Sequence, residues 1–202
     1  MLAVGPAGRH HAGMRLSLAP GLLIAMPRLV DPNFHRSVIL LCAHTREGAF
    51  GLVLNHALDL PMKAICEEQR IPWTGDLSQV ALAGGPCEQH RGWLLHRGGR
   101  RFEGTQVIDE DLAMTASRDG LVAYGQDPTG SYRLMLGYSG WGPGQLDREV
   151  LEGSWLTLPL DSRDPKIAEL VFVAPRATLW HKALALVGVD PNHLVEVPGH
   201  IH

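Results

Sequence analysis

The chain has 202 residues, of which 45% are hydrophobic and 19% charged, a balance typical of a soluble globular domain and not of a disordered or fibrous protein. Its formal net charge is −3 and it contains no block of basic residues, which disfavours direct binding to nucleic acid. No segment approaches the about 20 apolar residues that a membrane-spanning helix requires, so we expect no membrane association.

Cysteine use and the N-terminal residues indicate the compartment. The three cysteines are far apart in the sequence, at Cys42, Cys66 and Cys87. An odd, sparse set favours reduced thiols and a cytoplasmic location. Residues 1–15 are rich in Gly, Ala, Pro and His and are predicted to be a disordered leader, with Met14 as an alternative start. Pro20-Gly21 interrupts the apolar run that follows, which argues against a signal peptide.

Short apolar runs separated by turn residues predict strands along most of the chain. Residues 37–44 and 49–55 are joined by Thr45-Arg46-Glu47-Gly48 and form the best hairpin candidate. The full set of expected strands is 22–26, 37–44, 49–55, 80–83, 91–96, 105–108, 112–116, 132–136, 154–158 and 170–173.

Helices are expected at four places, over residues 61–69, 118–124, 145–153 and 178–187. Ser117 is a suitable N-cap for the second helix, and Asp119 falls in its first turn, where a negative charge interacts favourably with the helix dipole. Asp190-Pro191 predicts a last short helical turn. Adjacent hairpins mixed with short helices indicate an α+β fold, with a mixed, largely antiparallel sheet in one compact domain over residues 16–202.

Residues 137–146 are the most unusual stretch, with four glycines and Pro143 around Tyr138, Trp141 and Gln145. We expect a loop here, after the strand 132–136, and loops at strand ends commonly carry binding surfaces. A glycine-rich turn at a helix start can bind an anion through backbone N–H groups. The alternative is a tight turn that packs Trp141 against the core.

Several of these segments, in this order, resemble the YqgE/AlgH family, and the similarity covers about residues 20–189. The matching segments are 20–27, 31–34, 36–38, 48–55, 84–86, 117–119, 137–138, 140–146 and 154–156. The resemblance implies a bacterial, cytoplasmic protein with a compact α+β fold and no settled activity, some of whose relatives are called transcriptional regulators. One difference concerns residues 56–57: family members usually carry a basic residue and then proline after the asparagine, whereas this chain has His56-Ala57.

The sequence contains no established signature of a cofactor site. It has no Gly-Lys-Ser/Thr phosphate loop, and the spacing of Gly140, Gly142 and Gly144 is not that of a dinucleotide fingerprint. Eleven histidines are scattered, without a pair at ligand spacing on a helix. We therefore expect no metal and no cofactor.

Two functional hypotheses remain. The first, which we favour, is a non-enzymatic binding or regulatory module that recognises a small ligand or a protein partner. Its surface would be built from residues of turns and strand ends, namely Asn55, Gly84, Gly85, Ser117, Asp119, Tyr138, Trp141 and Gln145. Any regulation of transcription would then be indirect. All eight residues can also serve the fold alone, as turns and caps.

The second hypothesis is an enzyme of unrecognised class with a polar cleft around His44, Ser117 and Asp119. These side chains supply the types of group used in acid–base and nucleophilic catalysis. Gly-x-Ser-x-Gly is absent, however, and Ser117 and Asp119 suit helix capping. The hypothesis requires two of the three side chains to lie within hydrogen-bonding reach.

Overall fold

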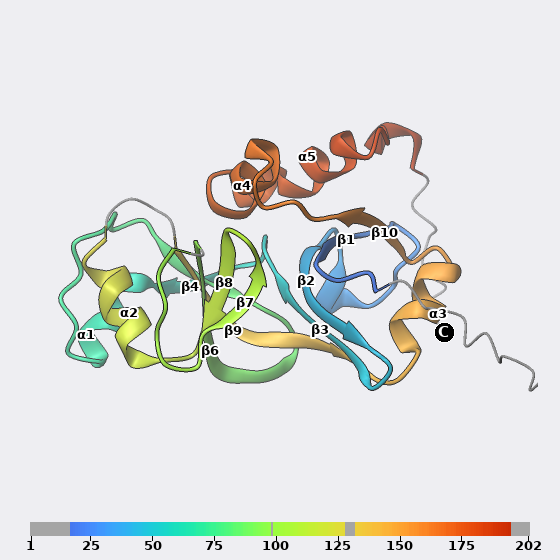
Figure 1. The fold of residues 1–202 in the computed structure, drawn as a ribbon. Coiled ribbons are helices and arrows are strands. Elements are labelled where there is room, and N and C mark those ends of the chain that lie inside the picture. The colour runs from blue at the N-terminus through green and yellow to red at the C-terminus, as the bar shows by residue number, and fades with distance from the viewer. Residues whose placement is uncertain (1–16, 98, 128–131, 195–202) are drawn as a thin grey trace, which may run out of the picture.

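The strands form a twisted sheet with helices along one side and at both ends (Figure 1). The computed structural model describes residues 17–97, 99–127 and 132–194, so the expected leader lies outside the described residues. The strands are β1 (Gly21–Ala25), β2 (Val38–Thr45), β3 (Gly48–Val53), β4 (Ala57–Pro61), β5 (Val80–Ala83), β6 (Cys87–Arg97), β7 (Gln106–Asp109), β8 (Leu112–Thr115), β9 (Tyr132–Trp141) and β10 (Trp155–Pro159).

Five α-helices and three short 3₁₀ helices lie within the described ranges. The α-helices are α1 (Met62–Glu68), α2 (Arg118–Gly125), α3 (Gln145–Leu151), α4 (Pro165–Phe172) and α5 (Leu179–Leu186), and the 3₁₀ helices are Pro32–Phe34, Arg176–Thr178 and Pro191–His193. In Figure 1, α4 and α5 lie above the sheet, α1 and α2 lie at the left end, and α3 lies at the right. The predicted α+β class and single domain are confirmed.

Strand β9 joins the two halves of the sheet. The main strand order is β10-β1-β2-β3-β9-β6-β8-β7, and β5 pairs with β9 and β4 at the side. All pairings are antiparallel except that between β5 and β9. The first half of β9 pairs with β5 and β6, and its last residues pair with β3. Strand β9 therefore contributes backbone pairs to both halves of the sheet.

The central strands β1 and β2 are covered on both faces. Because successive side chains point to opposite faces, Leu22 and Ile24 pack in the core beneath α4 and α5, while Leu23 packs in the core that contains Trp141 and Trp155. The continuous apolar sequence of these strands, without polar alternation, is explained by this double burial.

One predicted strand is wrong. Residues 170–173 belong to the end of α4 and to its C-cap. The helix starts at the signal Asp164-Pro165: the Asp164 carboxylate accepts a hydrogen bond from the Lys166 backbone N–H at 2.9 Å, and proline occupies the first helical position. A short apolar run by itself is ambiguous between strand and buried helix, and here the cap decides.

The expected helix over 178–187 is confirmed as α5. Its Trp180 indole N–H donates to the Ala25 carbonyl of β1 at 2.8 Å, in a buried position. This contact, together with the apolar packing of α4 and α5, holds the C-terminal helices against the sheet. Within the described ranges, no helix is both long enough and apolar enough to cross a lipid bilayer.

Candidate functional site

The expected loop over 137–146 is shorter in the structure. Strand β9 continues to Trp141, because Ser139, Gly140 and Trp141 pair with β3. Only residues 142–144 turn, and Gly144, with φ of 67°, precedes α3. The Gln145 side-chain carbonyl accepts from the Gly142 backbone N–H at 3.0 Å and closes this turn. Glycines lower local strand propensity, so the pairing with β3 was not visible in the sequence.

Trp141 is buried in the hydrophobic core. Its side chain is 6% exposed, and its indole N–H donates to Glu149 Oε2 at 3.0 Å. The Trp155 indole N–H donates to the same oxygen at 2.8 Å, while the Gln145 amide donates to Oε1 at 2.9 Å. We call Trp141, Trp155, Gln145 and Glu149 the tryptophan–glutamate cluster. The bonds it contains are consistent with a structural role for Trp141 and Gln145.

Three other candidates connect backbone segments. The Asn55 side chain accepts from the Val38 N–H and donates to the Arg36 carbonyl, both at 2.9 Å, so it joins the chain after β3 to the start of β2. Gly84 and Gly85 lie directly against residues 137–139 of β9, and the Gly84 carbonyl accepts from the Val53 N–H at 2.9 Å. A side chain at either glycine would collide with that backbone.

Ser117 caps α2 as expected. Its hydroxyl accepts from the Gly120 N–H at 3.2 Å, and Asp119 lies in the first helical turn with its side chain exposed. Both residues also line a surface hollow of about 470 Å³. The capping role and exposure to this hollow are compatible, because a hydroxyl that accepts one bond can still donate another.

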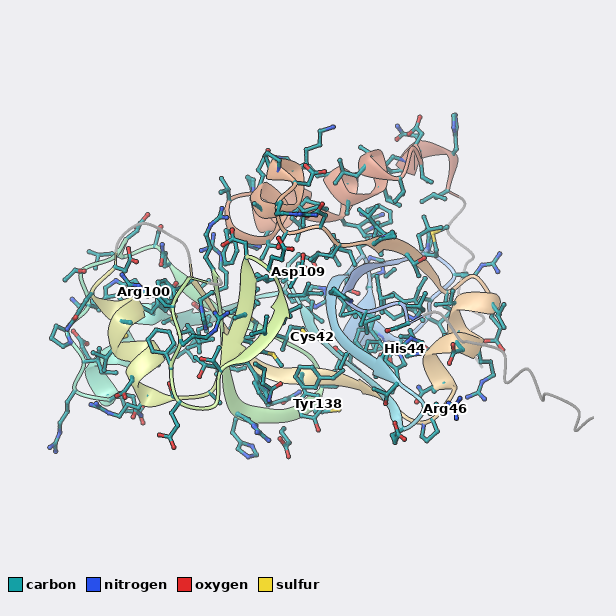
Figure 2. All side chains as sticks on the ribbon, viewed as in Figure 1. Cys42, His44, Arg46, Arg100, Asp109 and Tyr138 are labelled. Atoms are coloured by element: carbon teal, nitrogen blue, oxygen red, sulfur yellow. The ribbon has the colours of Figure 1, made fainter. Side chains whose placement is uncertain are left out.

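A second hollow of about 320 Å³ adjoins the first, with Arg91, Trp93 and Gln106 in both linings. Together we call them the aromatic groove. Its lining is Cys42, Ala43, Phe50, Arg91, Trp93, Glu103, Gly104, Gln106, Val107, Ile108, Met114, Ala116, Ser117, Arg118, Asp119 and Tyr138. Figure 2 shows Cys42 and Tyr138 near the centre of the molecule, with His44 on the side toward α3.

Three aromatic rings pack together in the groove. Phe50 stacks on Tyr138 with ring centroids 4.9 Å apart, and it meets Trp93 edge-on at 5.2 Å. The Arg91 guanidinium lies over the Trp93 ring, 4.4 Å from its centroid, and also pairs with Glu88 at 3.1 Å. Phe50 and Tyr138 are half-buried, so parts of both rings face solvent. This is a preformed apolar floor with charged groups at one side, as in many small-molecule sites.

The eight sequence-predicted residues thus divide into three groups, one of which, Asn55, Gly84 and Gly85, connects backbone segments. Tyr138, Ser117 and Asp119 line the aromatic groove, whereas Trp141 and Gln145 belong to the tryptophan–glutamate cluster. Sequence reasoning missed Phe50, Trp93 and Arg91. The alternation Arg91-x-Trp93 places both side chains on one face of a strand and is a signal that could have been used.

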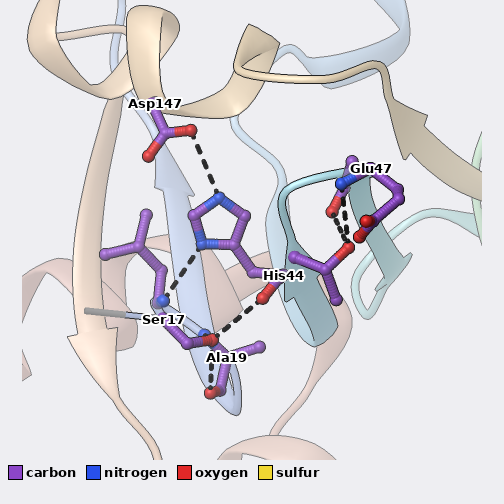
Figure 3. A network of polar contacts seen from close by, with 8 residues as sticks. Ser17, Ala19, His44, Glu47 and Asp147 are labelled. Carbon is purple, nitrogen blue, oxygen red and sulfur yellow. Dashed lines mark hydrogen bonds and ion pairs between the residues drawn. The ribbon is translucent and has the colours of Figure 1, made fainter. Parts of the chain in front are cut away.

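His44 of the enzyme hypothesis has partners other than Ser117 and Asp119 (Figure 3). The ring of His44 accepts a hydrogen bond from the Leu18 N–H at Nδ1, at 3.1 Å, and its Nε2 lies 3.4 Å from an Asp147 carboxylate oxygen of α3. Among the described residues, no hydrogen bond or ion pair joins His44 to Ser117 or Asp119. Burial of its sulfur raises the pKa of Cys42 far above the ordinary value, so this groove thiol stays protonated and weakly nucleophilic.

Two further histidines, His56 and His96, are neutral at pH 7, because burial lowers the pKa of each below its ordinary value. Burial lowers the pKa of His56, whose Nε2 lies 3.3 Å from the His35 carbonyl, so this position carries no charge where the resemblance led us to expect a basic residue. In the part of the chain that the structure describes, no group of three or more His, Cys, Asp or Glu side chains is arranged to hold a metal ion.

Protonation of His96 should couple stability to pH. Its side chain is 1% exposed, Nδ1–H donates to the Arg97 carbonyl at 2.8 Å, and burial lowers its pKa. The unfolded histidine has a pKa of about 6.5. The contribution of His96 to the free energy of unfolding is therefore fully present above that pH, and it is lost as the pH falls toward the lower pKa of the folded state. His56 acts in the same direction.

We therefore expect the free energy of unfolding to decline below pH 6.5, with His96 contributing at most about 1.4 kcal/mol per pH unit. Urea unfolding at pH 7.5, 6.5, 5.5 and 5.0 measures this slope. His96→Gln should make the slope shallower, while His90→Gln, at an exposed position of the same strand, should leave it unchanged. Equal slopes in the wild type and His96→Gln would show that His96 does not couple folding to pH.

The fold and the groove together define a class: a single-domain α+β protein with a preformed aromatic groove on a largely antiparallel sheet. The AlgH-like family model matches residues 22–192. A UPF0301 protein of Vibrio cholerae is 37% identical over 193 residues, covering 92% of this chain and all of the relative. A UPF0301 protein of Methylococcus capsulatus is 39% identical over 189 residues, covering 91% and 96%. The chain belongs to the AlgH-like family.

Solved structures agree with this assignment. The solution structure of the AlgH protein from Pseudomonas aeruginosa has a TM-score of 0.70 at 31% identity, covering 98% of this chain and all of that one. A crystal structure of a protein from Corynebacterium diphtheriae has a TM-score of 0.65 at 23% identity, covering 87% and 88%, and shows the same fold. The resemblance inferred from the sequence is confirmed.

Proposed function

We propose that the protein is a non-enzymatic binding module whose ligand is a small molecule with a flat apolar part, held in the aromatic groove. The observation that carries this proposal is the union of two hollows at Arg91, Trp93 and Gln106. One hollow offers the half-buried rings of Phe50 and Tyr138, and the other offers the polar side chains of Ser117 and Asp119. A ligand with an apolar end and a polar end suits such a site.

The charges of the groove add selectivity. Arg91 and Arg118 supply positive charge, and Glu103 and Asp119 supply negative charge. A ligand that spans both hollows therefore meets charges of both signs, which favours a polar end able to both donate and accept hydrogen bonds. The flat part gains most from stacking on the exposed faces of the rings.

We further propose that any role in regulation is indirect, through this ligand or a protein partner, in the cytoplasm. The basic residues of α5 are His181 and Lys182, and Lys182 is paired with Glu169 at 2.9 Å, so this helix has no basic face suited to the major groove of DNA. The net charge of −3 and the three free cysteines support the same view. The hydrogen-bonded state of His44 favours the binding module over the enzyme hypothesis.

Tryptophan fluorescence tests the location of the ligand. We expect a titration with nucleotides and aromatic metabolites to include compounds that change the emission of the wild type. Trp93→Phe should remove most of that change, since Trp93 lies in the groove, whereas Trp141→Phe should preserve it, since Trp141 lies in the tryptophan–glutamate cluster.

Calorimetry should show weaker binding to Tyr138→Ala, because the stacked ring is lost, with an effect of about 1 kcal/mol or more.

The opposite pattern would contradict the proposal that the ligand binds in the aromatic groove. If the fluorescence change followed Trp141, or if a ligand bound equally to the wild type and Tyr138→Ala, the ligand would lie elsewhere. Turnover of any bound compound would contradict the non-enzymatic part of the proposal and would call for Ser117→Ala and Asp119→Asn as the next variants.

A further inference from the structure

Arg91 lies where the two hollows of the aromatic groove meet. Its side chain lines both hollows, and its guanidinium lies over the Trp93 ring, 4.4 Å from the centroid, which favours this position at the junction. Within the described residues, the hydrogen bond of this guanidinium runs from Nη1 to Glu88 Oε2 at 3.1 Å. A guanidinium carries five N–H donors, so the bond to Glu88 leaves others for an acceptor on a ligand.

The ion pair between Arg91 and Glu88 can be exchanged for another. The two side chains are 50% and 47% exposed, and pairs this exposed contribute little to stability, because water competes for both charges. A ligand that already stacks on the rings of Phe50 and Tyr138 can therefore bring a carboxylate that replaces Glu88 and accepts two parallel hydrogen bonds from the guanidinium. Arg91 thus provides a place for an anionic group next to the flat apolar part of the ligand.

The hollow on the α2 side of this junction also offers negative charge. The exposed carboxylates of Asp119, in the first turn of α2, and Glu103 both line it. They attract a cationic group and repel the several negative charges of a phosphate chain. Arg118 lines the same hollow, and its Nη2 donates at 2.9 Å to the Gln69 carbonyl, which lies outside this lining. The Ser117 hydroxyl in the lining can accept a further hydrogen bond from an ammonium group.

Resting on the function proposed above, we infer that the ligand of the aromatic groove is a free aromatic α-amino acid. Its ring lies on Phe50 and Tyr138 in the first hollow. Its α-carbon lies at the junction, with the carboxylate on Arg91 and the ammonium directed toward Asp119. An α-amino acid carries both charges on one carbon, so it meets both signs of charge at the place where the hollows join.

Calorimetric titration of the full chain with matched probes tests this ligand class. The probes are L-phenylalanine, 3-phenylpropionate, which lacks the ammonium, and 2-phenylethylamine, which lacks the carboxylate. L-phenylalanine should bind about tenfold or more tightly than either of the other two, because each of them has lost a charge-assisted interaction. N-acetyl-L-phenylalanine and L-phenylalanine amide stand for the two ends of a peptide. Weaker binding of both is expected for a site that takes the free amino acid, and tighter binding of either would identify a peptide end instead.

Variants should affect the probes selectively. Arg91→Gln should weaken L-phenylalanine and 3-phenylpropionate by about fivefold or more without weakening 2-phenylethylamine. Asp119→Asn should weaken L-phenylalanine and 2-phenylethylamine without weakening 3-phenylpropionate. Glu88→Gln should strengthen 3-phenylpropionate by about twofold, since the competing carboxylate is gone, and damage to the fold cannot produce such a gain. The matched control is Arg163→Gln, because Arg163 is also exposed and paired with a neighbouring carboxylate, that of Asp161 at 2.9 Å, but lies outside the groove. It should bind every probe as the wild type does.

The outcomes separate this ligand class from the groove itself. If another aromatic compound bound in a way that Tyr138→Ala weakened, while L-phenylalanine bound no more tightly than its two analogues or not at all, the amino acid would be excluded and the groove would stand. Equal affinity of Arg91→Gln and the wild type for L-phenylalanine would also overturn the inference. Binding of L-phenylalanine that Tyr138→Ala left unchanged would contradict both the ligand class and the proposed site.

Discussion

Gly85→Ala is expected to be the most damaging single substitution in the part of the chain that the structure describes. A Cβ atom at residue 85 would lie 2.2 Å from the Tyr138 carbonyl carbon and 2.3 Å from its oxygen, both in the backbone of β9. The backbone φ of Gly85 is also +151°, a conformation that other residues rarely adopt. Backbone atoms cannot move aside as a side chain does, so relief would require β9 to separate from the turn after β5.

We expect a loss of at least about 3 kcal/mol in the free energy of unfolding, from steric overlap and backbone strain together. Urea unfolding followed by circular dichroism measures it, or the soluble yield does if the variant fails to fold. The matched control is Gly99→Ala, because a Cβ there meets nothing within 4 Å and the change should stay within about 0.5 kcal/mol. If the two variants were equally stable, the close approach of residues 85 and 138 would be incorrect.

Glu149→Ala is expected to have the second-largest effect. Its carboxylate accepts hydrogen bonds from the indoles of Trp141 and Trp155 and from the amide of Gln145. Removing it leaves two buried indole N–H donors without that partner, and each unsatisfied donor costs about 1–3 kcal/mol. We expect a loss of about 2–4 kcal/mol, with a weaker near-ultraviolet tryptophan signal because the two rings lose their common anchor.

Glu149→Gln keeps the shape of the side chain and removes its charge, so it separates the two effects. Its amide oxygen can still accept from the two indoles, but its NH₂ group cannot accept from Gln145, so the loss should be smaller than for alanine. Arg148→Ala, at an exposed position of the same helix, controls for helix propensity and should change stability by less than about 0.5 kcal/mol. A loss for Glu149→Ala no greater than that for Arg148→Ala would mean that the carboxylate does not stabilise the two tryptophans.

The local pattern predicted most strands and helices but not where all of them end. The hairpin of β2 and β3 was visible because turn residues separate two apolar runs, and α2 was visible because Ser117 caps it. Strand β9 extends farther than expected, since its last residues acquire partners from β3, about 90 residues earlier in the chain. The strand expected over 170–173 failed because the apolar run was read without its Asp164-Pro165 start.

The candidate site was less predictable than the fold. Tyr138, Ser117 and Asp119 line the aromatic groove, but Trp93 and Phe50 have ordinary strand sequences around them. Their proximity follows from two different pairings of β9, with β6 and with β3, which bring Trp93 and Phe50 to the same side as Tyr138. Single residues of a strand do not indicate which distant strand lies next to them.

The amino-acid sequence by itself determined the class of the molecule. Apolar runs, turn residues and capping residues indicated an α+β domain, because these features act over a few residues, and the segments that resemble the YqgE/AlgH family indicated the family. Tertiary structure decided which polar and aromatic groups lie next to each other. It buried Trp141 with its indole hydrogen-bonded to Glu149, and it brought Arg133 near Arg176. Those arrangements depend on contacts between segments far apart in the chain, and no local pattern specifies them.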